Sequence, residues 1–134
     1  MTHNKLIGAR GEELAAKFLE ELGYRIVARN FHVSHDEFDI IAEDDKYIVF
    51  TEVKSRAETE TNKRFGRPCM AVNYQKKQKL LRAAEEYIRK YRPGKQPRID
   101  VIEVYFPPIS KNIPICTDEL PALKITHLRN AVHY

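Results

Sequence analysis

The stretch that decides the fold covers residues 37–54, EFDIIAEDDKYIVFTEVK. Two short apolar segments, residues 38–42 and 47–54, flank an acidic turn at residues 43–46. Apolar residues that alternate with others and are bounded by turn residues indicate β-strands, and a short polar connection indicates a hairpin. We therefore expect two antiparallel strands here, in the middle of a hydrophobic sheet.

Three charged residues of this hairpin are expected at one end of it. Side chains alternate between the faces of a strand, so Glu52 and Lys54 share a face, and Ile48 and Phe50 continue that face as an apolar stripe. Asp39 lies near the start of the preceding strand, which an antiparallel hairpin places beside the end of the next one. Two carboxylates and an ammonium group should therefore lie close together.

This combination suits a site that hydrolyses phosphodiesters with a divalent metal. Mg²⁺ takes oxygen ligands, usually one or two carboxylates together with water and substrate phosphate. A nearby lysine can hold the scissile phosphate or help a metal-bound water to lose its proton. The alternative is structural, because charged residues at strand ends are often only solvated or joined in a cross-strand ion pair. The spacing of these residues by itself leaves both interpretations open.

Length and composition limit the class of protein. The chain has 134 residues, which suits a single domain over residues 1–134. No apolar run approaches the roughly 20 residues of a membrane helix, and the N-terminus lacks the apolar segment of a secretory signal, so we expect a cytoplasmic protein without a membrane partner. Cys69 and Cys116 could form a disulfide, but two reduced thiols are the simpler interpretation. The net charge of +4 is a mild bias towards polyanions.

The N-terminal part of the chain predicts a helix over residues 12–22, stopped by Gly23. Its expected buried stripe consists of Ala15, Phe18, Leu19 and Leu22. Glu12 falls at the edge of that stripe, so it is the acidic residue of this helix that could face the sheet. The alternative role of Glu12 is a favourable interaction with the N-terminal end of the helix dipole.

A basic segment and a basic helix follow the hairpin. From residue 55 the sequence has no hydrophobic periodicity, which predicts a long loop. The basic residues of this loop could follow a nucleic-acid backbone, or they could be ordinary loop charges. A long helix is then expected over residues 70–91, with a buried face and several exposed lysines, among them Lys76. The basic residues of the predicted loop are Arg56, Lys63, Arg64 and Arg67.

Further strands complete the expected sheet. Residues 24–31, 99–106 and 123–126 read as strands, and residues 128–132 as a short terminal turn or helix. Arg98 and Asp100 flank the start of one strand and could pair or support the site. The order of elements predicts an α/β sandwich with a mixed sheet, in which the long helix forms the crossover to a parallel strand.

The motifs, taken in this order, resemble the YraN family of small bacterial proteins. That family has a restriction-endonuclease-like fold and is similar to archaeal Holliday-junction resolvases and to the PD-(D/E)xK nucleases. The resemblance covers almost the whole chain. Each motif alone is weak, but the order and spacing of the motifs together are specific. They are residues 8–12 (GARGE), Arg29-Asn30, 37–41 (EFDII), 50–56 (FTEVKSR), Gly66, Ala71-Val72, Lys76, Ala83-Ala84, 98–101 (RIDV) and 125–131.

The resemblance implies a three-layer sandwich and assigns roles to single residues. Asp39 corresponds to the aspartate of the PD half-motif, and Glu52 and Lys54 correspond to the (D/E)xK half. Glu12 corresponds to a helix carboxylate that assists metal binding, so Glu12, Asp39 and Glu52 would hold Mg²⁺ or Mn²⁺. Lys76 and the basic loop would position a nucleic-acid strand. DNA is the expected nucleic acid, in preference to RNA.

The implied function is that of a Mg²⁺-dependent endonuclease, acting on branched DNA if it follows the resolvases. The alternative is a non-catalytic nucleic-acid-binding module, since a nuclease fold does not establish nuclease activity. Resolvases often act as dimers, so a homodimer is also expected. Two residues depart from the family pattern: Asp36 stands where glycine is usual, and Thr51 stands where valine is frequent.

Overall fold

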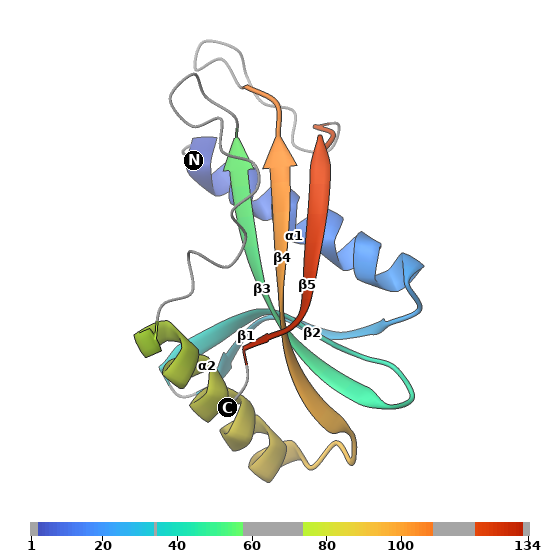
Figure 1. Ribbon diagram of the computed structural model, residues 1–134, viewed down its shortest axis with the longest axis vertical. Helices are drawn as coiled ribbons and strands as arrows, with labels where there is room; N and C mark the ends of the chain where they lie inside the picture. The colour runs from blue at the N-terminus through green and yellow to red at the C-terminus, as the bar shows by residue number, and fades with distance from the viewer. Residues whose placement is uncertain (1–2, 34, 58–73, 109–119, 133–134) are drawn as a thin grey trace.

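The computed structural model describes residues 3–33, 35–57, 74–108 and 120–132, and Figure 1 shows the elements in them. Within these residues the chain forms two helices and five strands. In chain order they are α1 (His3–Glu21), β1 (Arg25–Val33), β2 (Asp36–Glu43), β3 (Tyr47–Ala57), α2 (Tyr74–Tyr91), β4 (Gln96–Phe106) and β5 (Lys124–Val132).

The five strands form one mixed sheet in the order β1-β2-β3-β4-β5. β3 and β4 are parallel, and the other neighbouring pairs are antiparallel. α2 lies in the connection between the two parallel strands, as predicted for a crossover helix. The expected mixed sheet and the central hairpin are thus confirmed.

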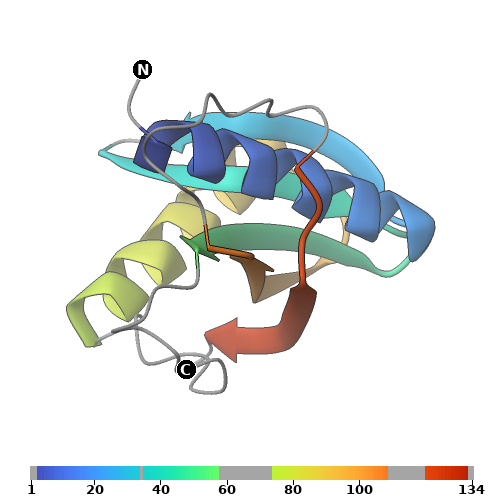
Figure 2. The same ribbon diagram turned by 90° about the horizontal axis from the view of Figure 1, so that it is seen from above.

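The two helices cover opposite faces of this sheet (Figure 2), and each closes a hydrophobic core. Alternation along the hairpin divides its side chains between the cores: Ile41 and Phe50 face α2, while Ile40 and Val49 face α1. α2 contributes Leu80, Leu81, Ala83, Ala84 and Tyr87 to its core, and α1 contributes Ile7, Ala15, Ala16 and Leu19 to the other. Leu22, predicted to be buried, is 46% exposed because it follows the last residue of α1.

The ladder between β2 and β3 opens towards one end of the sheet. Its last pair at that end is Ile40 with Thr51. β2 continues to pair with β1 as far as Asp36, whereas β3 continues to pair with β4 as far as Ala57. Figure 1 shows β3, β4 and β5 running together away from β1 and β2. We call the opening between β2 and β3, beyond the Ile40–Thr51 pair, the fork.

α1 approaches β3 closely at Gly11. A Cβ atom at this position would lie 1.7 Å from Ser55 Oγ and 2.9 Å from Ser55 Cβ, distances that real atoms do not reach. α1 also begins nine residues before the predicted start at Glu12, at His3. Gly8 and Gly11 disfavour a helix locally, but packing on the sheet overrides that preference.

Two predicted boundaries in the middle of the chain are wrong or untested. β3 extends to Ala57, so Arg56 belongs to a strand and not to a loop, because pairing with β4 continues through Arg56 and Tyr105. Residues 58–73 lie outside the described residues. The predicted positions that fall there are Lys63, Arg64, Arg67, Cys69 and the start of the long helix at residues 70–73, and Cys116 falls in residues 109–119, which are also outside.

The C-terminal segment was predicted wrongly. Residues 128–132 continue β5 as a strand and do not form a turn or helix. The partners of β5 shift between Ile99 and Val101 of β4, and Asn130 has a φ of 51° at this irregularity. Such a bulge interrupts the period-two alternation, so the strand is not visible in the sequence. No helix among the described residues is long and apolar enough to cross a membrane.

The close approach at Gly11 predicts that Gly11→Ala destabilises the protein by roughly 1–3 kcal/mol through overpacking against Ser55. Gly8→Ala is the matched control on the same helix, since no atom lies within 4 Å of its added Cβ. Removing a helical glycine there should stabilise the fold by about 0.5–1 kcal/mol. Urea unfolding measures both; equal effects of the two substitutions would contradict the packing role of Gly11.

The Thr51 side chain predicts a second stability effect. Thr51 is fully buried, and among the described residues its Oγ1 is a buried polar atom without a hydrogen-bond partner. Thr51→Val removes the unsatisfied hydroxyl at nearly constant shape and should stabilise the fold by about 1 kcal/mol. Thr126→Val, at a half-buried position of β5, should change stability by less than about 0.5 kcal/mol. A loss of stability in Thr51→Val, measured by thermal unfolding, would disprove this.

Candidate functional site

Asp39 lies at the fork, one residue beyond the last pair of the β2–β3 ladder. Its Oδ2 accepts a hydrogen bond of 2.7 Å from the backbone N–H of Val53. A side-chain acceptor thus takes the place that a backbone carbonyl would have in a continuing ladder. Phe38 packs in the α2-side core and Ile40 in the α1-side core, so the regular alternation of β2 is interrupted at Asp39.

Glu52 lies on the α2 face of β3 and is buried. Its Oε1 is 3.3 Å from Lys54 Nζ and 3.8 Å from Lys76 Nζ, so the residues predicted to share a face do come together. Lys76 was predicted to position a nucleic-acid strand. In the structure Lys76 lies in the first turn of α2, and the ion pair with Glu52 links this turn to β3.

Glu12 reaches the same region from α1, as its position at the edge of the apolar stripe predicted. Burial raises the pKa of Glu12; Arg29 opposes this rise, and the negative charges of Glu37 and Glu52 add to it. The carboxylate therefore senses charges from both strands of the fork. The close contact of Gly11 with β3 is what brings the neighbouring Glu12 within reach of them.

Asn30 and Glu37 belong to this cluster although sequence reasoning gave them no role. With its amide nitrogen turned towards the carboxylates, Asn30 donates to Glu12 Oε1 at 2.8 Å and to Glu37 Oε1 at 3.1 Å. Asn30 has a φ of 50°, a left-handed conformation that asparagine tolerates better than most residues. The available signal was the Arg29-Asn30 pair in the resembling motifs, but no local pattern shows that it meets Glu12.

The environment of the fork changes the pKa of Asp39. Burial raises its pKa most; the Val53 N–H bond lowers it, and the charges of Glu52, Glu12 and Glu37 raise it further, to about 7. An isolated aspartate would ionise near 3.8. The rise thus has two causes, the loss of hydration on burial and the charges of the neighbouring carboxylates. Strongly perturbed carboxylates of this kind are typical of functional sites.

The residues present suit a hard divalent cation by their chemistry. Carboxylate oxygens are the ligands that Mg²⁺ and Mn²⁺ prefer, and Mg²⁺ commonly uses only one or two of them. Within the described part of the chain, no three histidine, cysteine, aspartate or glutamate side chains form a ready-made metal-binding group. Asp39 and Glu52 are the two carboxylates of the fork that could hold a cation, with water or substrate oxygen in its remaining positions.

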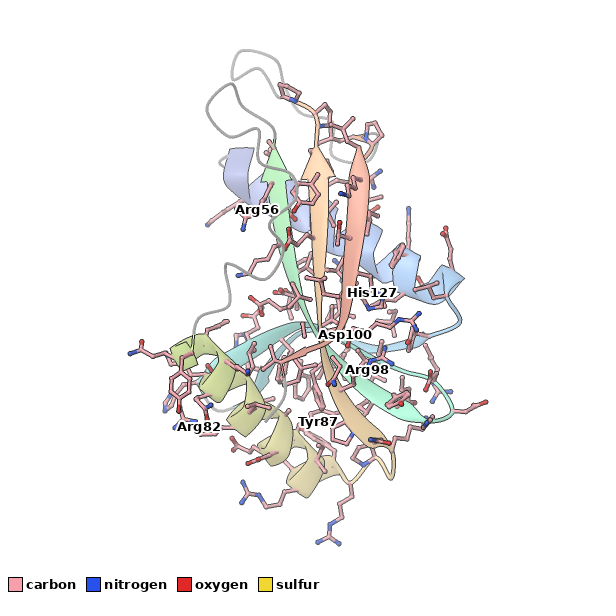
Figure 3. All side chains as sticks on the ribbon, in the orientation of Figure 1. Arg56, Arg82, Tyr87, Arg98, Asp100 and His127 are labelled. Atoms are coloured by element: carbon pink, nitrogen blue, oxygen red, sulfur yellow. The ribbon has the colours of Figure 1, made fainter. Side chains whose placement is uncertain are left out.

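Arg56 extends the line of charged side chains along β3. It occupies the same face as Glu52 and Lys54 and pairs in register with Tyr105 of β4. The Tyr105 hydroxyl donates to Glu103 Oε2, and both residues are buried. Burial and this hydrogen bond raise the pKa of Tyr105 to about 12, with the charge of Arg56 opposing. Figure 3 shows Arg56 on β3, away from the level of Asp100.

Arg98 and Asp100 form an ion pair, which is one of the two roles predicted for them. Arg98 donates to both oxygens of Asp100 at 2.9 Å, and the Asn130 N–H donates to Oδ1 at 2.9 Å. His127 Nε2 lies 2.7 Å from Oδ2, and Arg98 also donates to the Tyr24 hydroxyl at 2.5 Å. Figure 3 shows Arg98, Asp100 and His127 together at the centre of the sheet.

In this second cluster both carboxylate oxygens of Asp100 have hydrogen-bond partners. Burial opposes the ionisation of Asp100, but the hydrogen bonds from His127, Arg98 and the Asn130 N–H outweigh it and lower the pKa of Asp100. The cluster joins β4 to β5 and to Tyr24, the residue that precedes β1. We therefore assign it to the framework, although Asp100 is in register with Thr51, next to Glu52.

The raised pKa of Asp39 predicts a pH dependence of stability. Between about 3.8 and about 7 the folded state keeps a proton that the unfolded state has lost, so stability falls as pH rises through this window. Asp39→Asn removes this fall, and its stability relative to wild type should increase with pH by a few kcal/mol. Chemical unfolding at a series of pH values measures the difference.

Asp44→Asn is the control, because the pKa of Asp44 is shifted in the direction opposite to that of Asp39. The pKa of Asp44 is lowered by hydrogen bonds from the Tyr47 and Lys46 N–H groups, so its contribution appears as pH rises and is lost in acid. A stability difference between wild type and Asp39→Asn that stays constant over this pH range would contradict the described environment of Asp39.

Comparison with known proteins places the chain in a family. The family model described as "Uncharacterised protein family UPF0102" matches residues 11–104, which include the fork. A UPF0102 protein of Caldanaerobacter subterraneus subsp. tengcongensis is 38% identical over 96% of both chains, and one of Geobacter sulfurreducens is 39% identical over 96% of this chain and 90% of its own. One of Clostridium acetobutylicum is 46% identical over 75% of this chain and 80% of its own. The chain therefore belongs to the UPF0102 family, the YraN family that its motifs predicted.

Proposed function

We propose that this protein binds nucleic acid and hydrolyses a phosphodiester bond at the fork with the help of Mg²⁺ or Mn²⁺. The observation that carries the proposal is the meeting of Asp39, Glu52 and Lys54 at the fork, with Glu12 entering from α1. These residues come from two strands and a helix of the described chain. Branched DNA is the substrate class that the resemblance to resolvases implies.

The architecture is compatible with a restriction-endonuclease-like fold. A mixed sheet lies between two helices, and the candidate residues lie where two neighbouring strands separate. Separation exposes backbone and side-chain groups at the centre of a rigid sheet instead of at its outer edge. Each of the two strands keeps its outer partner, and a site on such strands holds its side chains more accurately than a site on loops.

The carboxylates have distinct tasks in this proposal. Asp39 and Glu52 would hold the cation, and Glu12 would assist directly or through water. When bound, the cation supplies positive charge to the phosphate and makes a water molecule more acidic. The Val53 N–H bond keeps one oxygen of Asp39 fixed, so the orientation of this carboxylate is set before any substrate arrives.

Lys54 would hold the attacking water or a non-bridging phosphate oxygen. Its ammonium group is 3.3 Å from Glu52 Oε1, and its side chain is 27% exposed, so Lys54 lies within the cluster and remains accessible to a ligand. A fixed cation beside the phosphate stabilises the charge that develops in the transition state. Arg56 on the same face, and Lys63, Arg64 and Arg67 outside the described residues, would contact the nucleic-acid backbone without reading its sequence.

The second candidate is a binding module without catalysis. The observation in its favour is that Glu52 contacts both Lys54 and Lys76, an arrangement that also serves to fasten α2 to β3. In this case the basic groups would hold phosphates and the carboxylates would be structural. The two candidates differ in their response to divalent cations.

The function is tested by cleavage of labelled branched and linear DNA in Mg²⁺ and Mn²⁺. Asp39→Asn and Lys54→Ala should each reduce cleavage by roughly 100-fold or more. Lys95→Ala is the matched control: Lys95 pairs with Glu43 at 3.2 Å and is 23% exposed, much like Lys54, but lies near the hairpin turn. It should cleave as wild type does.

Calorimetric titration of Mg²⁺ and Mn²⁺ separates the alternatives. Cation binding that is lost in Asp39→Asn together with cleavage supports the proposal. Cation binding without cleavage of any DNA or RNA would mean that the substrate is wrong. Undiminished cleavage by Asp39→Asn or Lys54→Ala would contradict the site, and nucleic-acid binding that ignores divalent cations would favour the binding module.

A further inference from the structure

A polar groove lies between α2 and the start of β2. It encloses about 420 Å³ and is lined by His35, Asp36, Lys79, Arg82 and Glu86, among others. Lys79 and Arg82 are exposed and one helical turn apart. Neither forms an ion pair in the part of the chain that the structure describes, although carboxylates line the same groove. The two cations are therefore available to an anionic ligand.

An aromatic hollow of about 60 Å³ continues from this groove, with Glu86 on the border of both. It lies between β1 and the last turns of α2, and its walls include Phe31, Tyr87, Lys90 and Tyr91. The Tyr87 and Tyr91 ring centroids are 4.6 Å apart, and Phe31 meets both rings edge-on at 5.6 and 5.8 Å. The cluster forms one rigid aromatic surface.

The Tyr91 ring is the accessible part of this surface. Tyr91 is 49% exposed, although large aromatic side chains usually bury most of their area, whereas Tyr87 is buried. Lys90 Nζ lies 5.4 Å from the centroid of the Tyr91 ring. Lys90 is itself exposed, so a flat ligand can displace its ammonium group from the ring and leave it beside the ligand's negative charge.

α2 connects these grooves to the fork. Lys76 lies against Glu52, Lys79 and Arg82 line the polar groove, and Tyr91 ends the series. The fifteen residue-to-residue steps from Lys76 to Tyr91 rise about 22 Å along the helix axis. Positive groups followed by an accessible aromatic ring are the features with which proteins bind unpaired nucleic-acid strands, since cations follow the backbone and rings stack on bases.

We propose that this combined surface binds a single-stranded segment of nucleic acid that leaves the fork, with phosphates at Lys79 and Arg82 and an unpaired base stacked on Tyr91. The inference rests on the proposed function for its ligand class and adds a binding site to it. Asp36 and Glu86 limit the net charge of the groove, so stacking on Tyr91 contributes a large part of the affinity. Stacking also makes the site prefer unpaired strands, because a duplex does not present the faces of its bases.

A tryptophan reporter tests the stacking contact directly, since the chain contains no tryptophan. In Tyr91→Trp, a short single-stranded oligothymidylate with hydrolysis-resistant phosphorothioate linkages should quench the indole fluorescence in a saturable way. Tyr74→Trp is the control at the other end of α2, where Tyr74 is 74% exposed and lines neither groove. Its fluorescence should change little at the same oligonucleotide concentrations.

Affinity measurements with the same oligonucleotide complete the test. Tyr91→Ala should weaken binding roughly 5- to 100-fold, and Tyr91→Phe, which keeps the ring, should bind as wild type does. Unfolding measurements establish that both variants are folded. Equal affinities of Tyr91→Ala and Tyr91→Phe, or equal quenching in the two tryptophan variants, would overturn this inference and leave the proposed cleavage at the fork standing. Failure of the wild type to bind any nucleic acid would overturn both.

Discussion

The separation of β2 from β3 beyond the Ile40–Thr51 pair is the constraint on which the candidate site depends. Each strand keeps a partner on its outer side, so the sheet loses only the hydrogen bonds between the two. The freed Val53 N–H is satisfied by the Asp39 carboxylate, since a buried backbone donor rarely remains unpaired. The same opening admits Glu12, which requires α1 to lie so close to β3 that only glycine fits at position 11.

Buried Asp100 and half-buried Asp39 differ in how the same sheet stabilises a negative charge. Asp100 receives hydrogen bonds from Arg98 and from the Asn130 N–H and contacts His127, and its pKa is lowered despite burial. Asp39 has one backbone hydrogen bond, and burial together with the charges of Glu52, Glu12 and Glu37 raises its pKa to about 7. The first arrangement is complete within the protein. In the second, burial and neighbouring carboxylates disfavour the charged form of Asp39, and a shift of this kind is typical of functional sites.

α2 combines a structural and a surface role in one element. Leu80, Ala83 and Ala84 close the core on one face of the sheet, which fixes the helix in place. Its first turn brings Lys76 to Glu52, and its exposed side carries Lys79, Arg82 and Tyr91. The surface proposed to bind a single strand is therefore fixed relative to the fork by the same packing that stabilises the fold.

The sequence by itself determined the features that depend on neighbours along the chain. The hairpin, the shared face of Glu52 and Lys54 and the buried stripe of α2 follow from local periodicity, and the ordered motifs identified the family. Only the tertiary structure decided what depends on distant contacts. The early start of α1, the extension of β3 through Arg56 and the strand at residues 128–132 arise from packing and from ladder bonds to β4. The meeting of Asn30 with Glu12 and Glu37, and the exposure of Tyr91 beside Phe31, likewise join segments that no local pattern connects.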